Sequence, residues 1–167
     1  KKDRIKNIKK FKNFKFIKQN VYNKKSLDNL IKKNKFDYVY HLAAQAGVRY
    51  SIKNPQKYYD TNIIGFTNLL EVLRKNKVKK IIYASSSSVY GDSKKFPLKE
   101  NLALKPKNVY ALSKKFNEDL ANVYKDLYKI NIVGIRFFTV FGEWGRPDMF
   151  MLKYLKNIYH KVNFELY

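Results

Sequence analysis

The chain has no cysteine and only two histidines among its 167 residues. Without cysteine it forms neither disulfides nor thiolate metal sites, and two histidines far apart in the sequence do not predict a metal site. No run of about 18 apolar residues occurs, and no secretory signal opens the sequence. We therefore expect a cytoplasmic protein with no bound metal and no membrane-spanning helix.

Acidic residues are also scarce, since 13 Asp and Glu stand against 36 Lys and Arg, which gives a net charge of +23. A charge of this size is typical of proteins that bind nucleic acid. Lysine outnumbers arginine about sixfold, however, whereas a nucleic-acid surface favours arginine for phosphate and base contacts. We attribute the charge to A/T-rich codon bias and solvated surfaces and expect no nucleic-acid partner. A basic nucleic-acid-binding protein is the alternative of another class.

Apolar residues recur along the chain with the spacing of strands and helices in alternation. The pattern predicts strands at residues 14–17, 36–42, 80–85 and 130–138, a further strand starting at 163–167, and helices at 26–34, 55–76, 110–128 and 149–160. Strands that alternate with helices of this length form β-α-β units around a parallel sheet. No linker or repeat interrupts the pattern, so the sequence predicts one α/β unit.

The segment from residue 81 to residue 114 holds the candidate chemistry. Its apolar run ends in four consecutive serines at 85–88, and Tyr110 and Lys114 follow, four residues apart, where a helical pattern begins. Open α/β sheets bind ligands where their strands end, and the four-residue spacing places phenol and ammonium on one helix face. A nearby cation favours phenolate, so Tyr110 is a candidate general base.

The Tyr-x-x-x-Lys spacing alone is weak evidence. With 14 tyrosines and many lysines in the chain it occurs twice, the other pair being Tyr90 and Lys94 in a turn-rich segment. A solvated helix face is the commoner explanation of such a pair taken alone. The serine-ended strand upstream of Tyr110 is what favours the catalytic interpretation.

Several longer segments of the chain match a family pattern. They are HLAAQAGVRYS (41–51), YYDTNIIGFTNLLEV (58–72), ASSSSVYG (84–91), YALSK (110–114) and RFFTVFGEWGRPDM (136–149). With these segments the chain resembles the NAD-dependent epimerase/dehydratase family, the extended short-chain dehydrogenase/reductases, and within it most resembles UDP-glucuronate 4-epimerases. The resemblance implies NAD as cofactor and the conversion of UDP-glucuronate to UDP-galacturonate through a transient 4-keto sugar.

The resemblance also implies a Rossmann-like, doubly wound parallel sheet. The family's glycine-rich turn, G-x-x-G-x-x-G, has no counterpart in the sequence. We therefore expect an internal fragment that lacks the first β-α-β unit and most of the C-terminal substrate domain. On this expectation residues 1–160 form an NAD-binding domain, incomplete at its N-terminus, and residues 161–167 begin the substrate-binding region. An inactive fragment is a further alternative.

For catalysis the resemblance makes Tyr110 the base that takes the proton of the sugar 4-hydroxyl. Lys114 lowers the pKa of this phenol and hydrogen-bonds the nicotinamide ribose, and Ser86 relays between substrate and Tyr110. Ser85 and Ser87 remain alternatives for the catalytic hydroxyl, although alternation along a strand turns both away from Ser86.

The remaining assignments also follow from the resemblance. The cofactor-binding residues are Ala43, Ala44, Gln45, Asn62, Ala84, Ser85, Tyr110, Lys114, Phe137 and Asn20, the last in place of an aspartate that contacts adenine. The substrate-binding residues are Ser87, Arg49, Thr139 and Arg146, because arginine offers carboxylate or diphosphate a bidentate fork. Tight packing explains the two alanines equally well. His41 is expected to be a core histidine and Arg136 to be structural.

The serine run also separates possible reactions. Dehydratases of the family carry Asp-Glu where Ser87 and Ser88 stand, so the resemblance favours epimerisation over elimination of water. UDP-glucose 4-epimerase, or another nucleotide-sugar reductase or dehydratase, is the alternative within the family. Relatives form homodimers through the helices expected here at 62–74 and 110–127, and we expect the same partner.

Overall fold

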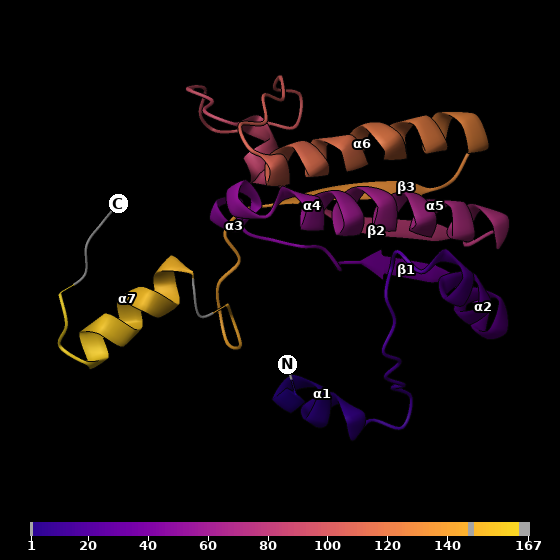
Figure 1. The fold of residues 1–167 in the computed structure, drawn as a ribbon, viewed down its shortest axis with the longest axis horizontal. Helices are drawn as coiled ribbons and strands as arrows, with labels where there is room; N and C mark the ends of the chain where they lie inside the picture. Colours follow the sequence, from indigo (N-terminus) through magenta and orange to yellow (C-terminus); the bar gives the residue numbers. More distant parts are fainter. Residues whose placement is uncertain (1, 147–148, 164–167) are drawn as a thin grey trace. The chain divides into compact units, whose positions relative to one another are not determined.

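The computed structural model describes residues 2–146 and 149–163, which fall into two compact units. The larger unit is Lys18–Phe138, and the smaller one comprises Lys1–Ile17 and Thr139–Tyr167. The smaller unit contains helices α1 (Lys2–Lys9) and α7 (Phe150–Tyr159), and the strands that the structure describes belong to the larger unit (Figure 1). None of the described helices is long and apolar enough to cross a membrane.

The larger unit is built on a parallel three-stranded sheet. Its strands are β1 (Tyr38–His41), β2 (Lys80–Ser86) and β3 (Ile132–Phe137), in the order β1-β2-β3. Parallel neighbours need crossover connections, and helices provide them here. The prediction of an α/β unit with a parallel sheet is confirmed.

The helices of this unit are α2 (Lys24–Asn34), α3 (Val48–Lys53), α4 (Pro55–Tyr58), α5 (Gly65–Lys75) and α6 (Val109–Tyr128). Asparagine side chains start two of them, since Asn23 accepts a hydrogen bond from the Ser26 amide and Asn108 from the Ala111 amide. Each cap satisfies a backbone N–H that a helix N-terminus leaves unpaired. The caps therefore fix where α2 and α6 begin.

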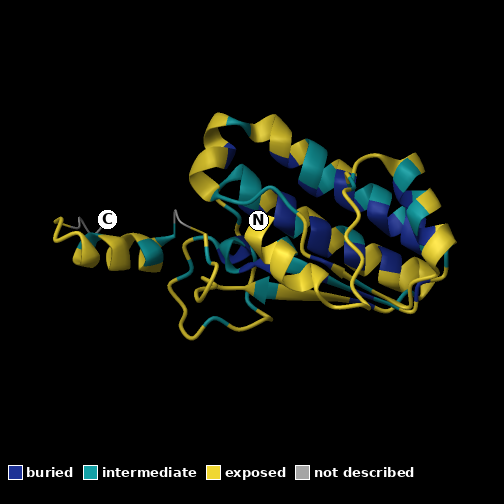
Figure 2. Ribbon diagram, turned by 90° about the horizontal axis from the view of Figure 1, so that it is seen from below, coloured by how far each residue is buried: buried dark blue, intermediate teal, exposed yellow. Residues whose placement is uncertain are grey.

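Helices α5 and α6 cover one face of the sheet (Figure 2). The core between them and the sheet is apolar, with Phe66 and Leu70 of α5 and Ile81 of β2 fully buried. On the other face of the sheet, Tyr40, Val133 and Ile135 are exposed. Parallel sheets are ordinarily covered on both faces, but the described helices of the larger unit leave these apolar side chains exposed.

Two sequence-based predictions of elements need correction. Residues 14–17, predicted as a strand, form no strand and belong to no described sheet, because none of the described strands lies beside them to complete the backbone hydrogen bonds. The helix predicted at 55–76 is not uniform, since a π-helical turn, Tyr59–Ile64, joins α4 to α5. The strand predicted at 163–167 lies almost entirely outside the described residues.

Candidate active site

The serine run begins on β2 and passes into a 3₁₀ turn, Ser87–Tyr90. Ser85 and Ser86 point to opposite sides of the strand. The Ser85 hydroxyl donates to the Glu118 carboxylate on α6, whereas the Ser86 hydroxyl accepts the Ser88 amide at 3.2 Å and caps the 3₁₀ turn. Ser86 pairs in register with Phe137 of β3, so these two predicted site residues are neighbours at the same end of the sheet.

Tyr110 and Lys114 both lie in the first turns of α6, as their spacing predicted. The Lys114 ammonium donates to the backbone oxygen of Ala84 at 2.7 Å, which brings it to the residue before the serine run. The Tyr110 ring is partly exposed and meets the buried Tyr58 ring edge to face, with 6.1 Å between centroids. The helix therefore presents the phenol and the ammonium at the strand end that carries the serines.

Lys114 is only 3% exposed, and this burial lowers its pKa from 10.5 to about 8. Across the described residues no carboxylate forms an ion pair with it. Nearby, His41 at the end of β1 has its pKa lowered to about 4, first by burial and then by the charge of Lys114. His41 packs against the Phe66 ring in the core at a tilt of 33°, and it is neutral at physiological pH.

The loop at residues 43–47, predicted to line the cofactor, is held by the helix that follows it. Asn62, 1% exposed, accepts the Gln45 amide at 2.8 Å and donates to the Gln45 oxygen at 3.0 Å. Its amide also donates to the Ser113 hydroxyl on α6 at 2.9 Å, and the Tyr58 hydroxyl donates to the Gly47 oxygen at 2.6 Å. Asn62 thus ties the loop to the helix that carries Tyr110, and its contact with cofactor stays a prediction.

The other predicted residues lie farther out or in the smaller unit. Asn20 is exposed in the segment before α2, where its side chain accepts the Tyr22 amide. Arg49 lies on α3, also exposed. Thr139 and Arg146 belong to the smaller unit, where both line an apolar hollow with Leu155. Their roles toward substrate stay predictions.

Some residues at this site were not singled out in the sequence. Glu118 is one, although it lies four residues after Lys114 and therefore on the same helix face as Tyr110. Tyr58 is another, a buried ring between the loop at 43–47 and Tyr110. Tyr58 lies four residues before Asn62, and this helical spacing could have predicted that the two side chains share a helix face.

The whole chain, residues 1–167, matches the model of the NAD dependent epimerase/dehydratase family. The chain belongs to this family. It is 47% identical over 134 residues to UDP-glucuronate 4-epimerase 6 of Arabidopsis thaliana, a match that covers 79% of this chain and 29% of the relative. The chain spans about half the length of the curated relatives that match most of it.

Solved structures of the family share the fold. The UDP-glucuronic acid 4-epimerase of Bacillus cereus, in complex with UDP-glucuronic acid and NAD, matches with a TM-score of 0.88 and 36% identity over 96% of this chain and 50% of that one. The UDP-N-acetylglucosamine 4-epimerase of Methanobrevibacter ruminantium M1, in complex with UDP-N-acetylmuramic acid, matches with a TM-score of 0.86 and 30% identity over 92% of this chain and 50% of that one. These matches establish the three-stranded sheet as part of a Rossmann-type fold.

Proposed function

We propose that the native protein carrying these 167 residues is an NAD-dependent nucleotide-sugar 4-epimerase that acts on UDP-glucuronate. One observation carries the proposal. Lys114 contacts the backbone of Ala84 at the entry to the serine run, and Tyr110 lies one turn earlier on the same helix face. In this proposal Tyr110 is the base, Lys114 the neighbouring cation and Ser86 the hydroxyl, at the carboxyl end of a central strand, where such folds bind ligands.

The donors at this strand end fit NAD. An ammonium carries three N–H donors, and the one hydrogen bond described for Lys114 leaves capacity for the hydroxyls of a ribose. The alanines at 43 and 44 leave room for a ring to approach the backbone after β1. When bound, NAD would supply reversible hydride transfer at the sugar carbon.

The chain's own residues move and hold the protons. Tyr110 takes the proton from the sugar 4-hydroxyl and later gives it back, assisted by the positive charge of Lys114. In the proposed reaction the Ser86 hydroxyl hydrogen-bonds the same sugar oxygen. Because the 3₁₀ turn holds Ser86 by its own Ser88 amide, the hydroxyl is oriented before substrate arrives.

UDP-glucuronate is the preferred substrate in this proposal because relatives named for that activity are similar to this chain and no carboxylate stands at Ser87 or Ser88 to eliminate water. Arg49 or Arg146 would recognise the sugar carboxylate. UDP-N-acetylglucosamine or UDP-glucose is the second candidate, supported by the matches to the enzyme of Methanobrevibacter ruminantium and to a UDP-glucose 4-epimerase of Thermus thermophilus. Conversion rates for the three UDP-sugars, measured on the native protein, separate these substrates.

The test of the reaction itself is Tyr110→Phe in the native protein, with conversion of UDP-glucuronate to UDP-galacturonate followed by chromatography. Loss of the base is expected to lower kcat by about 10²–10⁴-fold. Tyr128→Phe removes a hydroxyl from the far end of the same helix and serves as the control. Full activity in Tyr110→Phe, or no epimerisation by the parent, would overturn the proposal.

A further inference from the structure

A buried ion pair lies one helical turn beyond Lys114. Glu118 of α6 accepts two hydrogen bonds from Arg136 of β3, at 3.0 Å from Nε and 2.8 Å from Nη2. Both side chains are mostly buried, with 11% and 20% of their surfaces exposed. The two-pronged contact fixes the carboxylate in the plane of the guanidinium and raises the pKa of Arg136.

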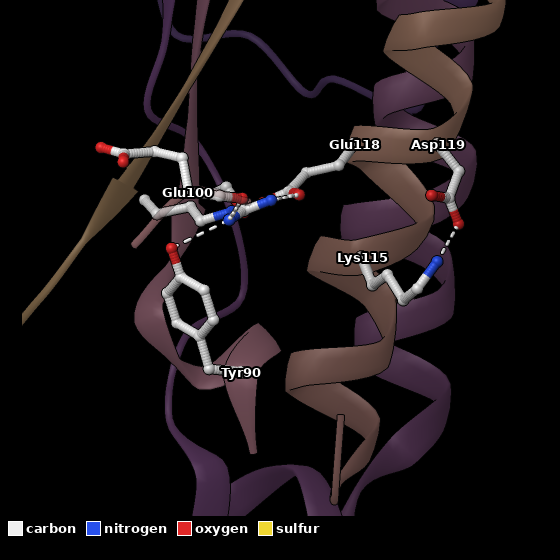
Figure 3. Close-up of polar contacts among 7 residues, drawn as sticks. Tyr90, Glu100, Lys115, Glu118 and Asp119 are labelled. Atoms are coloured by element: carbon white, nitrogen blue, oxygen red, sulfur yellow. Dashed lines mark hydrogen bonds and ion pairs between the residues drawn. The ribbon is translucent and has the colours of Figure 1, made fainter. Parts of the chain in front are cut away.

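We call residues 85–90, which comprise the end of β2 and the 3₁₀ turn, the serine turn. The Glu118–Arg136 pair contacts both ends of this segment (Figure 3). At the start of the turn, the Ser85 hydroxyl donates to Glu118. At its end, Arg136 Nη1 donates to the Tyr90 hydroxyl at 2.9 Å, and it also donates to the backbone oxygen of Glu100 at 2.9 Å. The residues between Ser85 and Tyr90, which include the predicted catalytic hydroxyl, are therefore anchored on either side by one ion pair.

The pair also aligns the helix with the strand. Tyr110, Lys114 and Glu118 succeed one another at four-residue intervals and share a face of α6. Lys114 bonds to Ala84 and Glu118 bonds to Ser85, so successive turns of the helix are attached to successive residues of β2. These two contacts fix the position of α6 along the direction of β2, and they therefore also fix the position of Tyr110 on that helix. On the other side of α6, Lys115 pairs with Asp119 at 2.6 Å and contacts none of this network (Figure 3).

We propose that Glu118 and Arg136 are positioning residues that hold the serine turn and the start of α6 in the relative placement that catalysis requires. The inference rests on the proposed function, which assigns Ser86 and Tyr110 to the chemistry. A buried ion pair is a poor device for stability alone, because apolar residues of similar volume commonly serve as well or better. We infer that the pair instead fixes the position of the serine turn relative to α6. A displacement of about 1 Å between reacting groups lowers the rate roughly 10²-fold.

Steady-state kinetics of Glu118→Gln in the native protein test this placement. Glutamine has the size of glutamate, but its side-chain amide cannot accept both hydrogen bonds from the Arg136 guanidinium. We expect kcat to fall by about 10–100-fold while KM for the UDP-sugar stays within about threefold. Glu71→Gln is the matched control, since Glu71 also pairs with an arginine, Arg74, and a tyrosine, Tyr124, but lies away from the serine turn.

Two further measurements separate placement from stability. In Glu118→Leu/Arg136→Met both charges are replaced by apolar groups, which is expected to restore the melting temperature to near that of the parent without restoring kcat. Hydrogen exchange of the Ser88 amide, which bonds to Ser86, is expected to quicken at least about tenfold in Glu118→Gln and to be unchanged in Glu71→Gln. This exchange is measurable whether or not the parent proves to be an epimerase.

The outcomes are distinct. Low kcat in both Glu118 variants, with faster Ser88 exchange in Glu118→Gln, supports the inference. Recovery of kcat together with melting temperature in the double variant, or parental kcat and Ser88 exchange in Glu118→Gln, overturns it. A parent without epimerase activity overturns the proposed function, and in that case Ser88 exchange alone decides whether the ion pair holds the turn.

Discussion

At the scale of single residues, the most informative group is a lysine whose burial opposes folding. The pKa of Lys114 falls from 10.5 to about 8, and at about 1.4 kcal/mol per pH unit this costs the folded state roughly 3 kcal/mol at neutral pH. A residue that destabilises the fold and forms no ion pair with any of the described carboxylates is typical of a functional site.

Lys114→Met is therefore expected to stabilise the protein at pH 7, by about 1–3 kcal/mol, while abolishing epimerisation. The stabilisation should shrink as the pH rises from 8 to 10.5, because the parent lysine then loses its proton in the folded state and its penalty disappears. Urea unfolding at pH 7 and pH 10 measures both values. Lys115→Met, at an ion pair on the outer side of α6, is the control and should not stabilise.

His41 makes the protein sensitive to mild acid. Its pKa is about 4 in the folded state against an ordinary 6.5, so the unfolded chain binds the proton first as the pH falls. Stability is expected to decline by up to about 3 kcal/mol between pH 6.5 and pH 4, and His41→Leu should flatten this part of the profile. The exposed His160 serves as control, since His160→Gln should leave the decline intact.

A second acid-sensitive group does not obscure this test. Glu71 has its pKa lowered to about 2, mainly by hydrogen bonds from Arg74 and Tyr124, so its contribution is lost only between pH 4.5 and pH 2. Thermal melts recorded from pH 7 down to pH 4.5 therefore report mostly on His41. An identical slope in parent and His41→Leu over that range would contradict the assignment.

At the scale of elements, the serine turn ends at a glycine that its backbone requires. Gly91 has φ of +62°, and a Cβ there would collide with the backbone oxygen of Lys105. Gly91→Ala is expected to lower the melting temperature and to displace the turn, with a loss of roughly 1–3 kcal/mol or more. Gly142→Ala is the matched control, because Gly142 also has a positive φ but nothing lies within 4 Å of its added Cβ.

The elements show where sequence patterns succeed and where they fail. The serine-ended strand and the helix of Tyr110 were predictable because burial imposes a period of two on strands and of 3.6 on helices. The strand at 14–17 failed because a strand depends on a neighbour, which local sequence does not reveal. Glu118 and Arg136 were not predicted as partners because they are far apart in the chain and meet only when α6 packs on the sheet.

At the scale of the whole molecule, α6 carries an apolar stripe that the core does not use. Leu112, Phe116, Val123 and Leu127 lie at helical spacing and are each between 38% and 67% exposed. A stripe of this kind on a long helix favours association with another helix, in agreement with the homodimer expected from the resemblance. We therefore include a homodimer through α5 and α6 in the proposed function.

Val123→Glu/Leu127→Glu is expected to convert the native protein to a monomer, because two carboxylates would be buried without partners in the interface. Light scattering after size-exclusion chromatography measures the mass. Tyr159→Glu, at an exposed position of α7, is the control and should leave the mass unchanged. A dimeric double variant would place the interface elsewhere.

The π-helical turn between α4 and α5 behaves like one extra residue inserted into an otherwise regular helix. Deleting Ile63 would let the backbone close into an unbroken α-helix and so cost little in helical hydrogen bonding. Each residue accounts for about 100° of helical rotation, however, so Tyr58 and Asn62 would swing to a different side of the helix relative to α5. The shortened chain would keep its secondary structure, which circular dichroism would measure. It would lose the hydrogen bonds by which Asn62 connects the loop at residues 43–47 to α6.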